Sequence, residues 1–278
     1  MSFKIVVDSC CDLPAEYKKD PRFEVVPLIL QVDEHVIVDD DTFDQQDYLA
    51  KVAASSECAK TACPSPELYM KAFDCDANDI YVITLSSKLS GSYNSALLGK
   101  NLYLEEIGEK NIHIIDSLSA SSGEVNIAYK VVDLAESGLK FEDVVTKIEE
   151  YRDEMSTFFV LDSLETLRKN GRLSGMKALV ATTLNIKPIC YGTNGSIDQR
   201  GQGIGMKKAL VKMADIIAAE VKNPEEKRVM IAHVNCYERA CVVRDLILKN
   251  TPFKEAVILD TAGVSTTYAG DGGIIVTY

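Results

Sequence analysis

Strands and helices alternate four times in the first half of the sequence. Apolar runs at 3–8, 23–31, 80–85 and 112–116 are typical of strands, and a segment with helical character follows each of them. This alternation predicts an α/β fold whose parallel sheet carries helices on both faces. Ligands of such sheets bind at the carboxyl ends of the strands, so a functional site is expected there.

Small hydroxyl residues follow the predicted strand at 80–85. Residues 85–96 are LSSKLSGSYNSA, and the next helix is predicted at 93–107. A strand that passes into a helix through such residues leaves N–H groups and the positive end of the helix dipole available to an anion. A serine-rich helix cap without a ligand also explains the segment. Ser9, Thr61 and Ser117 are expected along the same edge of the sheet.

The pattern changes near residue 155. Short strands are predicted at 157–161, 187–191, 196–198, 228–233, 256–259 and 273–277. Helices are predicted at 163–170, 176–184, 206–221 and 237–249. The Asn194-Gly195 pair between two of these strands favours a β-hairpin. We therefore expect two domains: 1–155 with the parallel sheet, and 156–278 with an α+β arrangement and a mixed sheet.

The composition narrows the classes of partner. The 278 residues carry a formal net charge of −12, which disfavours nucleic acid and anionic membranes as partners. The first residues predict a strand instead of a signal peptide, and no apolar run is long enough to insert stably in a membrane, so a cytoplasmic protein is expected. The eight cysteines include no C-x-x-C pair and are expected to be free thiols.

The sequence contains no recognisable catalytic motif. No G-x-S-x-G or G-x-x-x-x-G-K-[ST] motif occurs, and His35, His113 and His233 are more typical of structural positions. The acidic run 39–41 is expected to be a solvated loop. The cysteine pairs 58/63 and 236/241 are weak metal candidates, so no metal site is expected. Hydroxyl residues without a base favour a binding protein, with an acyl hydrolase or a phosphoryl-transfer enzyme as the alternative.

One arginine stands in an unusual place. Arg172 lies between Gly171 and the predicted helix at 176–184, where the helix dipole disfavours a cation. A specific anionic ligand would explain it, and so would a salt bridge to one of the 42 acidic residues.

Several short motifs follow one another along the chain. They are Asp8-Ser9-x-x-Asp12-Leu13-Pro14, Thr61-x-x-Pro64-Ser65-Pro66, the hydroxyl-rich segment 86–96, Asp116-Ser117, Gly171-Arg172-Leu173-Ser174 and Asn185-Ile186-Lys187-Pro188. In this order they resemble the motifs of the DegV family of bacterial fatty-acid-binding proteins, which serve a fatty acid kinase. The resemblance covers essentially the whole chain.

This resemblance implies a specific ligand and site. A single long-chain fatty acid would be buried between or beneath the two domains, with its carboxylate held by Thr61 and Ser90, by backbone amides around Gly91 and Ser92, and by Arg172. A separate, dihydroxyacetone-kinase-like fatty acid kinase would phosphorylate the bound acid. The protein itself would then need no cofactor and no catalytic residue. A carrier of a different amphiphile remains an alternative.

Two positions depart from the family pattern. Tyr268 stands where the family has a histidine that touches the carboxylate, and we expect its phenol to donate one hydrogen bond instead. Ile204, before the Lys207-Lys208 pair, stands where the family has an arginine tied to kinase docking, and Arg200 is a nearby substitute.

Overall fold

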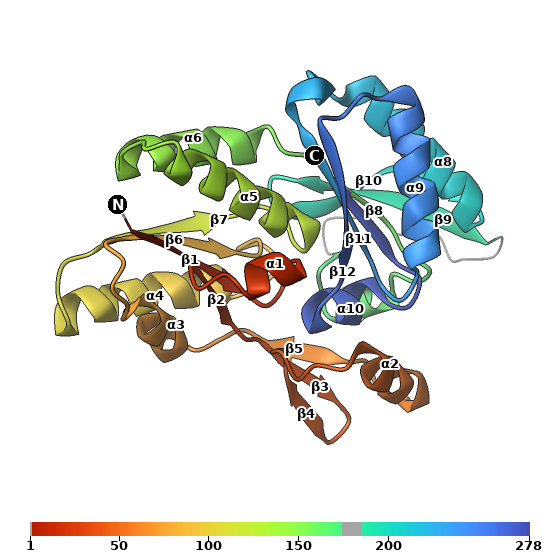
Figure 1. Cartoon of the computed structure of the whole chain (residues 1–278). Coiled ribbons are helices and arrows are strands. Elements are labelled where there is room, and N and C mark those ends of the chain that lie inside the picture. The colour runs from red at the N-terminus through yellow and green to blue at the C-terminus, as the bar shows by residue number, and fades with distance from the viewer. Residues whose placement is uncertain (1, 174–184) are drawn as a thin grey trace.

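The computed structural model describes residues 2–173 and 185–278. It contains a four-stranded, a six-stranded and a three-stranded sheet (Figure 1). The helix predicted at 176–184 and Ser174 of the arginine motif lie outside the described residues. In the described part of the chain, no helix has both the length and the apolar character needed to cross a membrane.

The four-stranded sheet is entirely parallel. Its order is β2 (Phe23–Val26), β1 (Phe3–Asp8), β6 (Asp79–Thr84) and β7 (Asn111–Asp116). One face is covered by α3 (Pro66–Phe73) and α4 (Ser92–Glu106), the other by α5 (Ser122–Glu136) and α6 (Phe141–Asp153). Successive side chains of β1 point to opposite faces, so Val6 packs with α3 and α4 whereas Ile5 and Val7 pack with α5. The predicted layered α/β arrangement is confirmed.

The six-stranded sheet is mixed, as predicted. Its order is β10 (Ser196–Ile204), β9 (Ile186–Thr193), β8 (Thr157–Val160), β13 (Ile274–Thr277), β11 (Arg228–His233) and β12 (Glu255–Asp260). Among these described strands only β11 and β12 pair in parallel. One face packs against α8 (Met206–Glu220) and α9 (Tyr237–Asn250). In the β9–β10 hairpin, Asn194 and Gly195 have φ values of 49° and 79°, which matches the type I′ turn that this residue pair favours.

The three-stranded sheet corrects two predictions. The run 23–31 is not one strand, because Pro27 has no N–H to donate and separates β2 from β3 (Ile29–Val32). β3 pairs antiparallel with β4 (His35–Val38) and with β5 (Lys60–Ala62). Thr61 therefore lies in a strand, although the segment around it was expected to be an extended loop.

Short helices complete the chain. They are α1 (Ala15–Lys18), α2 (Gln45–Ala54), α7 (Glu165–Lys169), α10 (Gly263–Ala269) and a 3-10 turn at Pro224–Glu226. The sequence pattern did not predict α10, which carries Tyr268.

Helix α5 joins the two large sheets into one core. Its residues Val125 and Ala128 belong to a buried cluster that includes Ile5 of the parallel sheet and Met230 and Ala232 of the mixed sheet. Figure 1 shows α5 lying between the two sheets. The halves of the chain are thus packed against each other through a shared apolar layer, which fixes their relative position.

Candidate ligand-binding cavity

A cavity lies between the loops at the carboxyl ends of the parallel strands and one face of the mixed sheet. It contains about 860 Å³ of space without atoms, the part open to solvent included. The loops after β1, β6 and β7 contribute Cys10, Leu89 and Ser119. The mixed sheet contributes Thr157 and Phe159, whose spacing of two residues places both on the same face.

Most of the lining is apolar. It includes Leu28, Leu85, Leu89, Leu118, Leu161, Leu167, Phe159, Ile197, Val264, Ala269 and Ile275. An apolar lining with few polar groups suits a ligand with a long hydrocarbon part, because apolar surface gains free energy when it leaves water.

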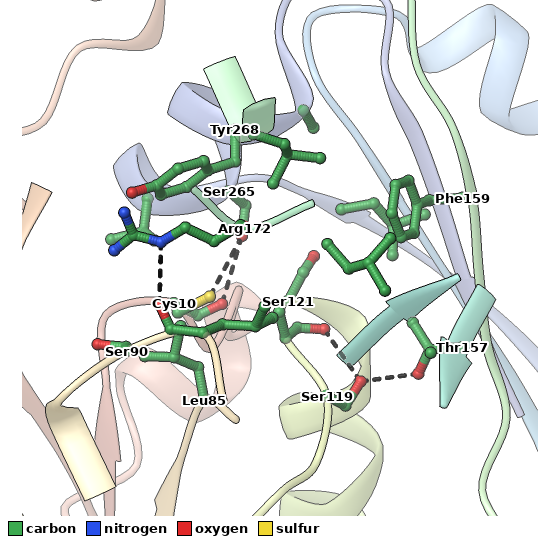
Figure 2. Close-up of a pocket in the computed structure, with 18 of the residues that line it drawn as sticks. Cys10, Leu85, Ser90, Ser119, Ser121, Thr157, Phe159, Arg172, Ser265 and Tyr268 are labelled. Carbon is green, nitrogen blue, oxygen red and sulfur yellow. Dashed lines mark hydrogen bonds between the residues drawn. The ribbon is translucent and has the colours of Figure 1, made fainter. Parts of the chain in front are cut away.

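Four polar side chains gather at one end, which we call the head end and define by Thr61, Ser90, Arg172 and Tyr268. Thr61 Oγ1 and the Tyr268 hydroxyl are 3.0 Å apart and share a hydrogen bond. The Arg172 guanidinium carbon lies 5.5 Å from the centre of the Tyr268 ring. Figure 2 shows Arg172, Tyr268 and Ser90 together on one side of the cavity.

The contacts of Arg172 leave its charge uncompensated among the described residues. Nε donates to the Leu89 carbonyl oxygen at 3.1 Å, and Nη1 donates to that of Asn170 at 2.6 Å. Two carbonyls and an aromatic face orient the guanidinium, but none of them carries a negative charge. A guanidinium has five N–H donors, of which the contacts with the described residues use two.

The other two predicted carboxylate-binding positions lie away from the cavity lining. The Ser92 hydroxyl is buried and donates to Asp8 Oδ2 at 2.6 Å, while its N–H donates to Ser90 Oγ at 3.2 Å. Gly91 is exposed. The structure therefore brings Thr61, Ser90, Arg172 and Tyr268 together and leaves Gly91 and Ser92 outside the cavity lining.

Asp8 and Asp12 hold two of the loops around the cavity. Asp8 accepts hydrogen bonds from the N–H groups of Cys10 and Leu85, and Asp12 accepts from the Ala262 N–H at 2.6 Å and from Ser121. Burial raises the pKa of Asp8 to about 6 and that of Asp12 to about 7, and these hydrogen bonds offset part of the rise.

Asp39 holds the start of α10. Its two oxygens accept from the N–H groups of Gly263 and Val264 at 2.7 and 2.9 Å, and only 2% of its surface is exposed. The expectation that 39–41 forms a solvated loop is therefore wrong for Asp39. Burial raises the pKa of Asp39, against the effect of the two N–H groups. A carboxylate from the first half of the chain thus positions the helix that carries Tyr268.

The opposite end of the cavity, the far end, is closed by hydrogen bonds between the two halves of the chain. The hydroxyls of Ser119 and Thr157 are 2.7 Å apart, and the Ser86 hydroxyl donates to the Gly195 carbonyl oxygen at 2.7 Å. Figure 2 shows Thr157 and Ser119 on the side away from Arg172 and Tyr268.

The sequence did not point to several lining residues. Cys10, Ser121 and Ser265 line the middle of the cavity. For the residues that the mixed sheet contributes, the sequence offered only the strand predicted at 157–161. The alternation of its side chains shows which residues share a face of the sheet, but not that this face lines a cavity.

The described residues offer one cluster with metal-ligand character, Asp8, Cys10 and Glu124, all fully or almost fully buried. Metal binding would need the Cys10 thiolate, but burial and the nearby carboxyl groups raise the pKa of this thiol well above its usual value. The cluster is thus a poor fit to a metal ion.

Neither of the two histidine–carboxylate pairs reaches the cavity lining. His233 Nε2 lies 3.2 Å from Asp260, and His113 Nε2 lies 2.9 Å from Glu149. His35 lies in β4 and is exposed.

Comparison with known proteins shows that similar sequences and structures exist over the whole length of the chain. A family model described as "Uncharacterised protein, DegV family" matches residues 2–278. A DegV domain-containing protein of Streptococcus gordonii is 36% identical, over 100% of this chain and 99% of its own.

Solved structures are similar over the same length. A DegV family protein of Ruminococcus gnavus, solved with vaccenic acid, is 53% identical with a TM-score of 0.97, over 100% of this chain and 99% of that one. The Streptococcus pneumoniae Fatty Acid Kinase B3 protein, loaded with linoleic acid, is 35% identical with a TM-score of 0.89, over 100% and 99%.

Proposed function

Because the chain belongs to the DegV family, we propose that it binds one long-chain fatty acid in the cavity between its two large sheets. The carboxylate lies at the head end, and the acyl chain runs toward the far end. The observation that carries this proposal is the convergence of Thr61, Ser90, Arg172 and Tyr268 at one end of an otherwise apolar cavity. Residues 1–155 and 156–278 act as the two domains that enclose the acid.

The energetics divide the work between the two ends of the ligand. Each methylene removed from water contributes about 0.8 kcal/mol, so the acyl chain supplies most of the affinity. The head end replaces the water lost by the carboxylate. Arg172 supplies the charge-assisted hydrogen bonds, and the hydroxyls orient the group. Tyr268 fits this role because a phenol can donate one hydrogen bond.

We further propose that the bound acid is presented to a separate fatty acid kinase in the cytoplasm, and that catalysis takes place in that kinase. Support comes from the similarity to the S. pneumoniae Fatty Acid Kinase B3 protein. Ala62 and Gly91, directly after Thr61 and Ser90 in the chain, are exposed, so a partner has access near the head end.

The proposal is tested by extracting lipid from the purified protein and identifying it by mass spectrometry. We expect one fatty acid per chain, and its amount should fall in the Arg172→Met variant. Absence of bound acid, both as purified and after incubation with free fatty acids, contradicts the proposal. Turnover of acyl esters that is lost in Ser90→Ala would support the hydrolase alternative.

The kinase step is tested separately. The loaded protein is mixed with a bacterial fatty acid kinase and ATP, and acyl phosphate is trapped with hydroxylamine. Ile204 is 65% exposed, and Arg200 is engaged by Glu220, with Nε and Oε1 2.9 Å apart. Ile204→Arg should therefore increase the rate, whereas Val242→Arg, at an exposed position of α9, should not.

A further inference from the structure

Gly192 is a glycine whose presence the protein's own structure does not require. It lies inside strand β9, and its φ is outside the left-handed range that favours glycine. A Cβ at this position would lie 3.6 Å from the Thr157 Cβ, an ordinary van der Waals contact. A glycine weakens the interior of a strand, and one reason for a glycine there is the close approach of another group. The nearest atoms of the described residues, those of Thr157, are too far from Gly192 to require a glycine.

The missing side chain of Gly192 belongs to the cavity. Gly192 pairs directly with Ile197 of β10, and directly opposed residues of an antiparallel pair point to the same face. Ile197, Thr157 and Gly192 itself all line the cavity. A side chain at 192 would therefore project into the space between the two large sheets.

This space lies at the far end. Thr157, the nearest neighbour of a Cβ at 192, shares a hydrogen bond with Ser119 on the side of the cavity away from Arg172 and Tyr268 (Figure 2). The Ser86–Gly195 hydrogen bond closes the hairpin turn over the same end. A chain anchored by its carboxylate at the head end would place its terminal methyl group here.

We propose that Gly192 sets the longest acyl chain that the cavity accepts, because the absence of its side chain makes room for the last carbons of the tail. The inference rests on the proposed function. Substitution at 192 should shorten the accepted chain without weakening the hold on the carboxylate.

The experiment compares Gly192→Val with the wild type for binding of stearic, myristic and lauric acids. Valine suits a strand and an ordinary φ, so the variant is expected to fold. Its two methyl groups displace about two methylenes, which should weaken stearic acid binding by about tenfold or more and lauric acid binding by less than about threefold. The lipid that copurifies should shift to shorter chains.

Gly201→Ala is the matched control. Gly201 lies in the other strand of the hairpin, and a Cβ there would meet Ile189 and Ile216 at 3.4 and 3.5 Å, on the face covered by α8. This variant should keep the wild-type order of affinities. If Gly192→Val does not fold, Gly192→Ala tests the same effect, with a smaller selective loss of stearic acid.

The outcomes separate the two proposals. A folded Gly192 variant with an unchanged chain-length profile, or with equal losses for all three acids, overturns the role of Gly192 and leaves fatty acid binding intact. A wild-type protein that binds none of the three acids overturns the proposed function itself.

Discussion

Thr61 and Tyr268 share a hydrogen bond of 3.0 Å although they are 207 residues apart in the sequence. Thr61 comes from the small sheet inserted after β2, and Tyr268 comes from the short helix α10. Their contact means that the head end forms only when the first and last parts of the chain are packed together.

Tyr268→Phe removes this hydroxyl and keeps the ring beneath Arg172. We expect fatty acid affinity to fall by about three- to tenfold, the usual effect of one lost hydrogen bond, as measured by isothermal titration. Tyr48→Phe is the control, because it removes a hydroxyl bonded to Thr267 of the same helix, outside the cavity lining. Unchanged affinity and pose in Tyr268→Phe would remove Tyr268 from the site.

Arg172→Met keeps an apolar stem and removes the charge. Hydrogen bonds between charged groups are stronger than neutral ones, so we expect the affinity for a fatty acid to fall by about tenfold or more. The salt dependence of binding should also weaken, as measured by titration at two ionic strengths. Arg168→Met, four residues earlier, removes an exposed partner of Glu165 and should leave both quantities unchanged. Equal behaviour of the two variants would argue against Arg172 as the carboxylate ligand.

Asp39→Ala leaves the Gly263 and Val264 N–H groups without an acceptor at the start of α10. We expect the free energy of unfolding to fall by about 1–3 kcal/mol in urea titrations. Fatty acid affinity should fall as well, because α10 carries Tyr268. The side chain of the adjacent residue Asp40 is exposed and accepts hydrogen bonds from Thr42 in its own turn, so Asp40→Ala should have little effect on either quantity.

The raised pKa values of Asp8 and Asp12 make stability depend on pH. Between about pH 4 and pH 7 the folded chain holds protons on these buried carboxyls that the unfolded chain has released. The free energy of unfolding should therefore decrease as pH rises through this window. Asp12→Asn keeps an acceptor for the Ala262 N–H and cannot titrate. The decline of its free energy of unfolding between about pH 4 and pH 7 should therefore be shallower than that of the wild type in chemical denaturation. A slope equal to that of the wild type would mean that Asp12 is already ionised in the folded protein.

Local signals in the sequence were sufficient for much of the fold. Asn194-Gly195 defines its hairpin without help from the rest of the chain, and the apolar runs located every strand of the parallel sheet. Strand β5 was not predicted, because its three residues are too few to show the alternation of a strand. Helix α10 was not predicted, because six of its seven residues are buried and its sequence therefore shows no amphipathic pattern.

The site was less accessible to local reasoning. Ser90 and Ser92 are serines of the same loop, and nothing in the sequence distinguishes their roles. In the structure, Ser92 donates a hydrogen bond to the buried Asp8, whereas Ser90 lines the cavity. Asp39 has the composition of a solvated turn, and only its distant partners in α10 explain its burial. The family resemblance anticipated that Thr61, Arg172 and Tyr268 meet, because it carries long-range information that spacing along the chain lacks.

The position of β13 has a consequence for biosynthesis. This strand lies in the interior of its sheet, between β8 and β11, and is the last strand of that sheet to be synthesised. Until residues 274–277 emerge from the ribosome, β8 and β11 face each other across a gap and both present unpaired edges. The wall that holds Phe159 and Gly192 is therefore completed only after β13 has entered between its two neighbours, so the cavity is not enclosed before this strand has been made.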